Sequence, residues 1–424
     1  MIATRFALAL ASVLAGGLLA GLAAPSPAAA GLHLVSANAT GVFANADSEA
    51  EVGGSVSGNG RFVAFESEAT NLDGSAADRQ AYVKDLATGK VRRVSKAKNG
   101  DPADQRVFDP TISADGRFVT YTVSASNLPG GDGNINQVYL YDRETRKTRL
   151  VSRGSHGAGD DHSGYSAISA HGRFVEFSSY AGNLPGGKEP ESVYVRDVKR
   201  GKTILVSRNN AGELVEGSEE GQSISASGRL ALFESDDPDL PGGGIHEHIY
   251  VRDLRKGTTT LVDRNTAGKI ASDSSWYPSI SGNGRFVGFY GDGGNLPGGG
   301  THSQAYLRDL KRGSTKLASR NNAGAPQDGN TVLYVKASND GRFVTFEADG
   351  ANLPGGDGTR QVYVRDMVRG KTKLLSRAGG TPGDGDSGNP SMSANGRWVI
   401  FRSYASNLGG NPFMHNVFRA GPFG

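Results

Sequence analysis

Residues 112–119 read ISADGRFV, and close copies of this stretch recur along the chain. Copies begin at Ile168 (ISAHGRFV), Ile224 (ISASGRLA) and Ile280 (ISGNGRFV). Each contains a Gly-Arg pair, and the arginines of successive pairs lie 55 to 57 residues apart. Self-similarity at a fixed period indicates a repeat architecture. The seven arginines are Arg61, Arg117, Arg173, Arg229, Arg285, Arg342 and Arg397.

Each repeat predicts four short strands. In the second repeat the strands are expected at 110–113, 117–123, 137–142 and 147–153, separated by two tight turns and one long loop. Val, Ile, Phe and Tyr fill these segments, whereas Gly, Asn and Asp separate them. A four-stranded unit of this length is typical of a propeller blade. The sequence therefore predicts an all-β, seven-bladed β-propeller.

The two ends of the repeat array predict how the ring closes. HLVSAN at 33–38 matches RLVSRG at 149–154, which ends the second repeat, but it precedes the first repeat. The last repeat stops after NVFRA at 416–420 and lacks this fourth strand. We expect the N-terminal segment to complete the last blade, because closure removes two exposed sheet edges.

The first thirty residues predict export. Arg5, an apolar run from Phe6 to Ala24, and small residues at Ala28 and Ala30 are typical of a secretory signal peptide cleaved before Gly31. A membrane anchor is the weaker alternative, because small residues dominate the run and no basic stop-transfer cluster follows it. We expect 1–30 to be removed and 31–424 to form a single propeller, secreted or associated with the cell envelope.

The composition excludes several function classes. The chain has no cysteine, which rules out disulfides, thiol nucleophiles and thiolate metal sites. Its formal net charge of +3 argues against a general nucleic-acid binder, which needs a marked basic excess. No second apolar run is long enough to cross a bilayer, so we expect no membrane insertion, and we expect a monomer.

The repeat resembles a known family. The pattern SxDGRFVxF followed by QVYVRDLxxGKTxLVSR is similar to the WD-like propeller repeat of TolB and related exported bacterial proteins, and it covers all seven repeats. The resemblance implies the propeller fold. The same repeat occurs in propeller domains of prolyl-oligopeptidase-type peptidases, where a hydrolase domain accompanies it. TolB has six blades and a separate small domain, so its partners are not transferred to this chain.

The recurrent polar motifs are interpreted as structural. An Asp ends the third strand of six repeats, and in five of them a Gly follows four residues later, which fits a hairpin loop. The NLPGG loops are followed by an Asp in only two repeats, at Asp132 and Asp357, too few carboxylates for a typical calcium site. His246 and His302 lie on different blades, too far apart for zinc. We predict no metal, no cofactor and no catalytic residue.

The strand order separates the charges between two faces. The Gly-Arg arginines fall on the face of the tight turns, here called the turn face. The connections between blades, together with the long loops, form the opposite face, here called the interblade face. These connections are acidic and carry aromatic residues just before the innermost strands. The candidate ligand-binding residues are Asp104, Phe108, Asp160, Asp161, Tyr165, Glu216, Asp273, Trp276 and Asp384.

Three functions remain open from the sequence. The leading hypothesis is a secreted, non-enzymatic binding propeller whose acidic, aromatic interblade face meets a protein, peptide or glycan. The second is a hydrolase or lyase acting on carbohydrate or peptide at the mouth of the central channel. The third is a cell-envelope structural module that binds an anionic polymer through its basic turn face.

Overall fold

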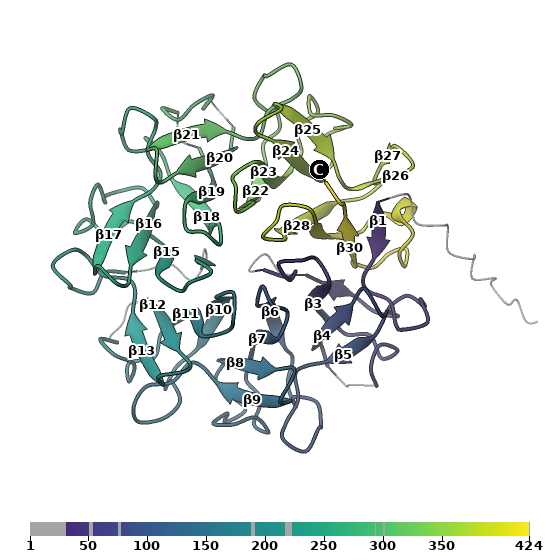
Figure 1. The fold of residues 1–424 in the computed structure, drawn as a ribbon, viewed down its shortest axis with the longest axis vertical. Coiled ribbons are helices and arrows are strands. Elements are labelled where there is room, and N and C mark those ends of the chain that lie inside the picture. Colours follow the sequence, from purple (N-terminus) through teal and green to yellow (C-terminus); the bar gives the residue numbers. More distant parts are fainter. Residues whose placement is uncertain are drawn as a thin grey trace, which may run out of the picture.

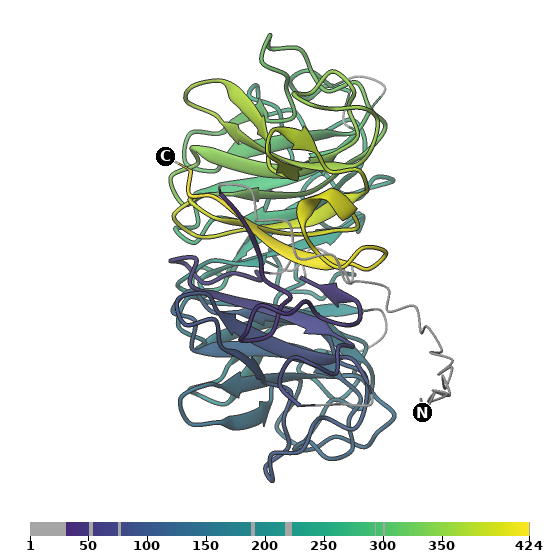
Figure 2. The same cartoon turned by 90° about the vertical axis from the view of Figure 1, so that its right-hand side faces the viewer.

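The computed structural model describes residues 31–50, 54–74, 78–187, 191–216, 223–292, 294–299 and 302–423. These residues form seven four-stranded antiparallel sheets arranged as a ring around a central axis (Figure 1). Seen from the side, the ring is a flattened body (Figure 2). The predicted seven-bladed propeller is confirmed, whereas the predicted signal peptide at 1–30 lies outside the described residues.

Each blade runs from an inner to an outer strand. Blade 1 contains β2 (Ser48–Glu49), β3 (Phe62–Ser67), β4 (Gln80–Asp85) and β5 (Val91–Arg93). Blade 2 contains β6 (Phe108–Ile112), β7 (Phe118–Val123), β8 (Gln137–Asp142) and β9 (Lys147–Leu150). Blade 3 contains β10 (Ser163–Ile168), β11 (Phe174–Ser179), β12 (Ser192–Asp197) and β13 (Lys202–Leu205). Blade 4 contains β14 (Ser223–Ile224), β15 (Leu230–Ser235), β16 (His248–Asp253) and β17 (Thr258–Leu261).

The remaining blades follow the same order. Blade 5 contains β18 (Ser275–Ile280), β19 (Phe286–Gly291), β20 (Gln304–Asp309) and β21 (Ser314–Leu317). Blade 6 contains β22 (Val332–Ala337), β23 (Phe343–Ala348), β24 (Gln361–Asp366) and β25 (Lys371–Leu374). Blade 7 contains β28 (Ser387–Met392), β29 (Val399–Ser403), β30 (Asn416–Ala420) and β1 (Leu32–Leu34). A small hairpin, β26 (Arg377–Ala378) and β27 (Thr381–Pro382), and one 3₁₀ turn, η1 (Ser406–Leu408), complete the described elements.

The N-terminal strand closes the ring as predicted. Strand β1 pairs antiparallel with β30, with Leu32 opposite Ala420 and Leu34 opposite Phe418 (Figure 1). Beyond the strand, the N–H of Val35 donates to the carbonyl of Val417 over 2.7 Å. The first and last parts of the chain therefore share one sheet.

The core lies between the blades. The second strand of each blade is a nearly continuous apolar run, and in blade 1 the residues Val63, Ala64 and Phe65 are fully buried. Such strands are covered on both faces. In every blade an aromatic ring of the second strand stacks on one of the third strand at 5.4–6.0 Å between centroids. Apolar packing between neighbouring blades is the main stabilising contribution that follows from this arrangement.

The recurrent Gly-Arg arginine and the recurrent Asp form an ion pair on the turn face. In blade 2, Arg117 donates from Nε and Nη2 to the two carboxylate oxygens of Asp142 over 2.9 and 2.7 Å. Asp142 also accepts the backbone N–H of Glu144, which confirms the predicted turn role. These hydrogen bonds, that of Arg117 first, lower the pKa of Asp142 to about 2. The other pairs are Arg61–Asp85, Arg173–Asp197, Arg229–Asp253, Arg285–Asp309 and Arg342–Asp366.

Blade 7 departs from this pattern. Its Gly-Arg arginine is Arg397, but its third strand ends at Ala420, and Gly421 stands at the position of the Asp of the other blades. The described part of the chain contains no ion pair for Arg397.

The described residues contain no helix with the length and apolar character needed to cross a membrane.

Candidate functional site

Five of the seven innermost strands carry a bulge at the end nearest the interblade face. Five residues at equivalent positions have positive φ values between 46° and 53°: Asp109, Tyr165, Tyr277, Tyr334 and Asn389. The register with the second strand shifts at each of these positions. A bulge with an unpaired residue re-aims a side chain and is frequent beside functional sites.

This bulge corrects one sequence-based expectation. Phe108, Tyr165 and Trp276 were expected just before the inner strands, but they lie within β6, β10 and β18. The extra residue interrupts the alternation of inward and outward side chains. For this reason the sequence pattern indicates a strand that begins later than the observed one.

Buried glutamates of one blade bind the bulge of the next blade. Glu66 Oε2 accepts the N–H of Asp109 over 3.0 Å, and Glu347 Oε2 accepts that of Asn389 over 3.0 Å. Glu234 Oε1 accepts the N–H of Tyr277 over 2.6 Å. All three glutamates are at most 2% exposed. Burial raises the pKa of Glu347, and it raises the pKa of Glu66 to about 7.

Sequence reasoning missed these glutamates, although a signal was present. They all occupy the fifth position of the second strand, which in the other blades is Thr122, Ser178, Tyr290 or Arg402. This position varies in charge between otherwise regular repeats. Aligning the repeats position by position would have identified it.

The same end of blade 1 holds a network of charges. Arg79 Nη1 lies 2.5 Å from Glu66 Oε1 and 3.5 Å from Glu49 Oε1. Across the blade 7 boundary, Arg402 Nη1 lies 2.7 Å from Glu49 Oε2, and His415 Nδ1 lies 3.4 Å from Glu49 Oε1. The hydrogen bond from His415 and the charges of Arg402 and Arg79 lower the pKa of Glu49 to about 2, against the opposing effect of burial.

A cavity of about 520 Å³ opens between blades 2 and 3 at this face. It brings together two of the predicted candidates, Phe108 and Tyr165, from neighbouring inner strands. Tyr165 is 42% exposed and Tyr180, also in the lining, is 39% exposed. The lining further includes Asp109, Asn136, His162 and Glu191.

Asp109 gives this cavity a titratable carboxyl group. Burial, together with the nearby charge of Glu49, raises the pKa of Asp109 to about 6. At neutral pH the carboxyl is therefore largely ionised, and mild acid neutralises it. This cavity, with its aromatic rings and carboxylates, is here called the mouth cavity.

A second group of aromatic rings lies at blades 5 and 6. Tyr277 is 5.0 Å from Tyr334 and 5.7 Å from Tyr290 between ring centroids, and Trp276 is 5.5 Å from Tyr290. The predicted candidate Trp276 therefore belongs to an aromatic cluster formed by adjacent blades.

Three predicted acidic candidates hold the long loops of their own blades. Asp384 accepts hydrogen bonds from the backbone N and the Oγ of Ser406, both at 2.6 Å. Asp104 accepts the equivalent bonds from Ser126, and Asp160 accepts the N–H of Asn183 over 3.2 Å. These contacts give the three carboxylates a structural role in positioning the loops. None of the three is among the residues that line the mouth cavity.

The other acidic candidates are not among the residues that line the mouth cavity either. Asp161 accepts the N–H of His162 over 2.7 Å, and Asp273 lies 3.5 Å from Nδ1 of His246. Glu216 is exposed, and its carbonyl accepts the hydroxyl of Ser235 over 2.6 Å. Among the residues that the structure describes, no three His, Asp or Glu side chains are grouped to hold a metal ion.

Comparison with known structures shows the propeller fold. An oligogalacturonate lyase in complex with manganese is 12% identical with a TM-score of 0.55, over 89% of this chain and 90% of that chain. The oligogalacturonate lyase of Vibrio parahaemolyticus is 11% identical with a TM-score of 0.54, over 89% and 91%. TolB from Acinetobacter baumannii is a looser match, 14% identical with a TM-score of 0.42, over 86% and 80%. No protein-family model and no curated protein matches the sequence.

Proposed function

We propose that this protein is a non-enzymatic binding propeller that presents its interblade face to a protein or peptide ligand through a basic side chain. The observation that carries the proposal is the mouth cavity, whose lining includes Phe108, Tyr165 and the acidic residue Asp109. Aromatic faces attract cations, and carboxylates add charge complementarity. A Lys or Arg side chain of the ligand matches both properties.

The proposal predicts a specific pH dependence. Above pH 6 the ionised Asp109 attracts a cation, whereas below pH 6 its protonation removes this attraction. Affinity for a basic peptide is therefore expected to fall as the pH is lowered from 7 to 5.

Calorimetric titration with a lysine-rich peptide tests the proposal. Tyr165→Ala is expected to weaken binding by about tenfold, because it removes an exposed ring from the cavity. Tyr334→Ala is the matched control, since Tyr334 occupies the same bulge position in blade 6. Absence of peptide binding, or equal losses in the two variants, contradicts the proposal. Binding of a neutral glycan in place of the peptide would identify the other ligand class.

A propeller enzyme acting on carbohydrate or peptide is the second candidate. Asp109 favours it, because a carboxyl with a pKa of about 6 in a cavity is suited to proton transfer near neutral pH. The two oligogalacturonate lyases share the fold, which makes acidic oligosaccharides a reasonable first substrate to assay. Loss of turnover in Asp109→Asn, with the variant still folded, would support this candidate over simple binding.

The envelope module that binds anionic polymer through the turn face receives less support. Six of the seven Gly-Arg arginines on that face are paired with aspartates, which neutralise their charge.

We also propose that the protein is exported and that its signal peptide is removed. Strand β1 begins at Leu32, so cleavage before Gly31 retains the strand that closes the ring. Mass spectrometry of the protein recovered from the culture medium or the cell envelope tests this, with Gly31 as the expected first residue.

A further inference from the structure

The outer boundary between blades 2 and 3 contains two adjoining cavities of about 450 and 310 Å³. Arg149 and Val198 line both of them. Arg153 and Arg196 line the larger cavity, and Lys199 lines the smaller one. The two cavities, here called the rim groove, are separate from the mouth cavity and carry the opposite charge.

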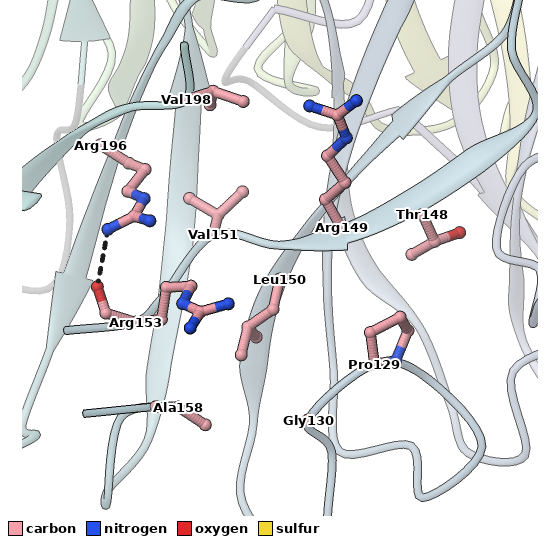
Figure 3. A pocket seen from close by; sticks show the side chains of 11 residues that line it. Pro129, Gly130, Thr148, Arg149, Leu150, Val151, Arg153, Ala158, Arg196 and Val198 are labelled. Carbon is pink, nitrogen blue, oxygen red and sulfur yellow. Dashed lines mark hydrogen bonds between the residues drawn. The ribbon is translucent and has the colours of Figure 1, made fainter. Parts of the chain in front are cut away.

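Three guanidinium groups surround the larger cavity. Figure 3 shows Arg153 and Arg196 on one side of Val151 and Leu150, with Arg149 on the other side. Arg149 and Arg153 are exposed, and Arg196 is partly buried. Burial, together with the charge of Arg153, lowers the pKa of Arg196. The larger cavity therefore combines three positive charges with the apolar side chains of Leu150 and Val151.

None of these three arginines forms an ion pair in the described part of the chain, although the charge of the neighbouring Asp197 acts on Arg196. No Asp or Glu lines the larger cavity, and no described ion pair involves Arg149, Arg153 or Arg196. Arg196 Nη1 instead donates to the carbonyl of Arg153 over 3.2 Å (Figure 3) and to Thr203 Oγ1 over 2.9 Å. In the smaller cavity Asp142 is bound by Arg117, so the carboxylate does not neutralise Arg149 or Lys199.

The boundary between blades 3 and 4 provides a comparison. Arg208 and Arg252 repeat the Arg153 and Arg196 pair there, and Arg252 donates to the carbonyl of Asn209 over 3.2 Å. Thr203 Oγ1 bonds the carbonyl of Arg153, and Thr259 Oγ1 bonds that of Arg208, both at 2.5 Å. Ile204 occupies the position of Arg149. The arginine pair thus belongs to the repeat, whereas Arg149 is an additional cation at the rim groove.

A second boundary has three cations but a different geometry. Between blades 5 and 6, Lys316 takes the place of Arg149. The partner Arg320 there donates from Nε to the carbonyl of Gly324 over 2.7 Å, so its guanidinium is already engaged. No such bond is observed for Arg153, whose described contacts are all made by its backbone.

We propose that the rim groove binds a small ligand with two oxyanion groups, carboxylates or phosphates, joined by a carbon skeleton. Arg149, Arg153 and Arg196 hold one oxyanion, because planar guanidinium groups bind carboxylate and phosphate in a bidentate manner. Lys199 attracts the second oxyanion in the adjoining cavity. Leu150 and Val198 contact the carbon skeleton between them. The proposal is independent of the peptide site, which lies on the interblade face.

Calorimetric titration of the full chain at low ionic strength tests the proposal with two probes. Fructose 1,6-bisphosphate supplies two phosphates and citrate supplies carboxylates, so the probe that binds identifies the oxyanion. Arg149→Gln and Arg153→Gln are each expected to weaken binding of that probe by about tenfold. Lys199→Gln is expected to weaken binding of the probe but not that of its counterpart with a single oxyanion group, inorganic phosphate or acetate.

Arg208→Gln is the matched control, with an unchanged affinity as the expected result. Thermal denaturation of each variant establishes that it is folded. The proposal is overturned if neither probe binds, if Arg149→Gln binds as tightly as the unmodified chain, or if Arg208→Gln weakens binding as much as Arg153→Gln does.

Discussion

The same repeat builds both faces of the propeller, but the residues of the seven blades are more alike on the turn face than on the interblade face. On the turn face, six blades share the same Arg–Asp ion pair with nearly the same geometry. On the interblade face, the residue before the third strand changes from blade to blade. In blades 1 to 7 it is Arg79, Asn136, Glu191, Glu247, Ser303, Arg360 and His415.

This difference distinguishes the residues that the fold requires in every blade from the residues that a binding site requires at one place. A contact that every blade requires is repeated, because each blade must make the same turn and pack in the same way. A binding site requires only a few particular residues at one place on the ring. Four of these seven residues lie at the two features described above: Asn136 and Glu191 line the mouth cavity, and Arg79 and His415 contact Glu49.

The largest expected effect comes from breaking the ring, on which both faces depend. Deletion of residues 31–38 removes β1 and leaves β30 as an unpaired edge strand. Because blade 7 then loses its outer strand and its apolar contacts, we expect the melting temperature to fall by more than 10 °C, with rapid proteolysis of blade 7.

A synthetic peptide of residues 31–38 provides the control for that deletion. Added in excess, it is expected to restore part of the lost thermal stability, because it can pair with β30 in place of the covalent strand. A deletion variant that melts at the original temperature would show that the closing strand contributes little.

A smaller effect is expected from the charge network of the interblade face. Arg79→Met leaves Glu66 buried without its ion pair, and we expect a loss of about 3 kcal/mol in unfolding free energy at pH 8. Glu66 has a folded pKa of about 7, above its ordinary value of 4.5, so the folded state binds the extra proton between these values. Stability therefore falls as the pH rises through this window, and more steeply in the variant.

Urea denaturation at pH 5 and pH 8 measures this difference. Arg106→Met serves as control, because Arg106 is a half-exposed partner of Glu68 in the same region. We expect the control to change stability by less than about 0.5 kcal/mol at either pH. A loss in Arg79→Met that is the same at both pH values would contradict the assigned role of Glu66.

The sequence allowed the fold to be predicted to the level of blade number and ring closure, because these depend on local strand and turn signals repeated seven times. It allowed less of the site to be predicted. Glu66 meets Asp109 across a blade boundary and 43 residues along the chain, through a backbone bulge that strand patterns do not indicate. Acidic residues in the interblade connections were easier to find but ambiguous, since Asp104 and Asp384 bind nearby loops.

The smallest expected effect concerns the regularity of the turn face. Asp142→Asn removes the charge that Arg117 binds, and we expect the melting temperature at pH 7 to fall by about 1–3 °C. The modest size follows from solvent screening of a partly exposed pair. Because the folded pKa of Asp142 is lowered to about 2, its contribution is present above pH 4 and is lost as the pH falls from 4 to 2.

Blade 7 supplies the matched control for this ion pair. Arg397 occupies the same Gly-Arg position, but Gly421 stands where the other blades have the aspartate, since Val399 pairs with Ala420 as Val119 pairs with Tyr141. Arg397→Gln is therefore expected to leave the melting temperature unchanged between pH 2 and 7, whereas Arg117→Gln is expected to lower it fully above pH 4 and progressively less as the pH falls to 2. If both arginine variants behave alike, the ion pairs do not stabilise the turns, and the regularity of the turn face must come from its glycines and backbone hydrogen bonds alone.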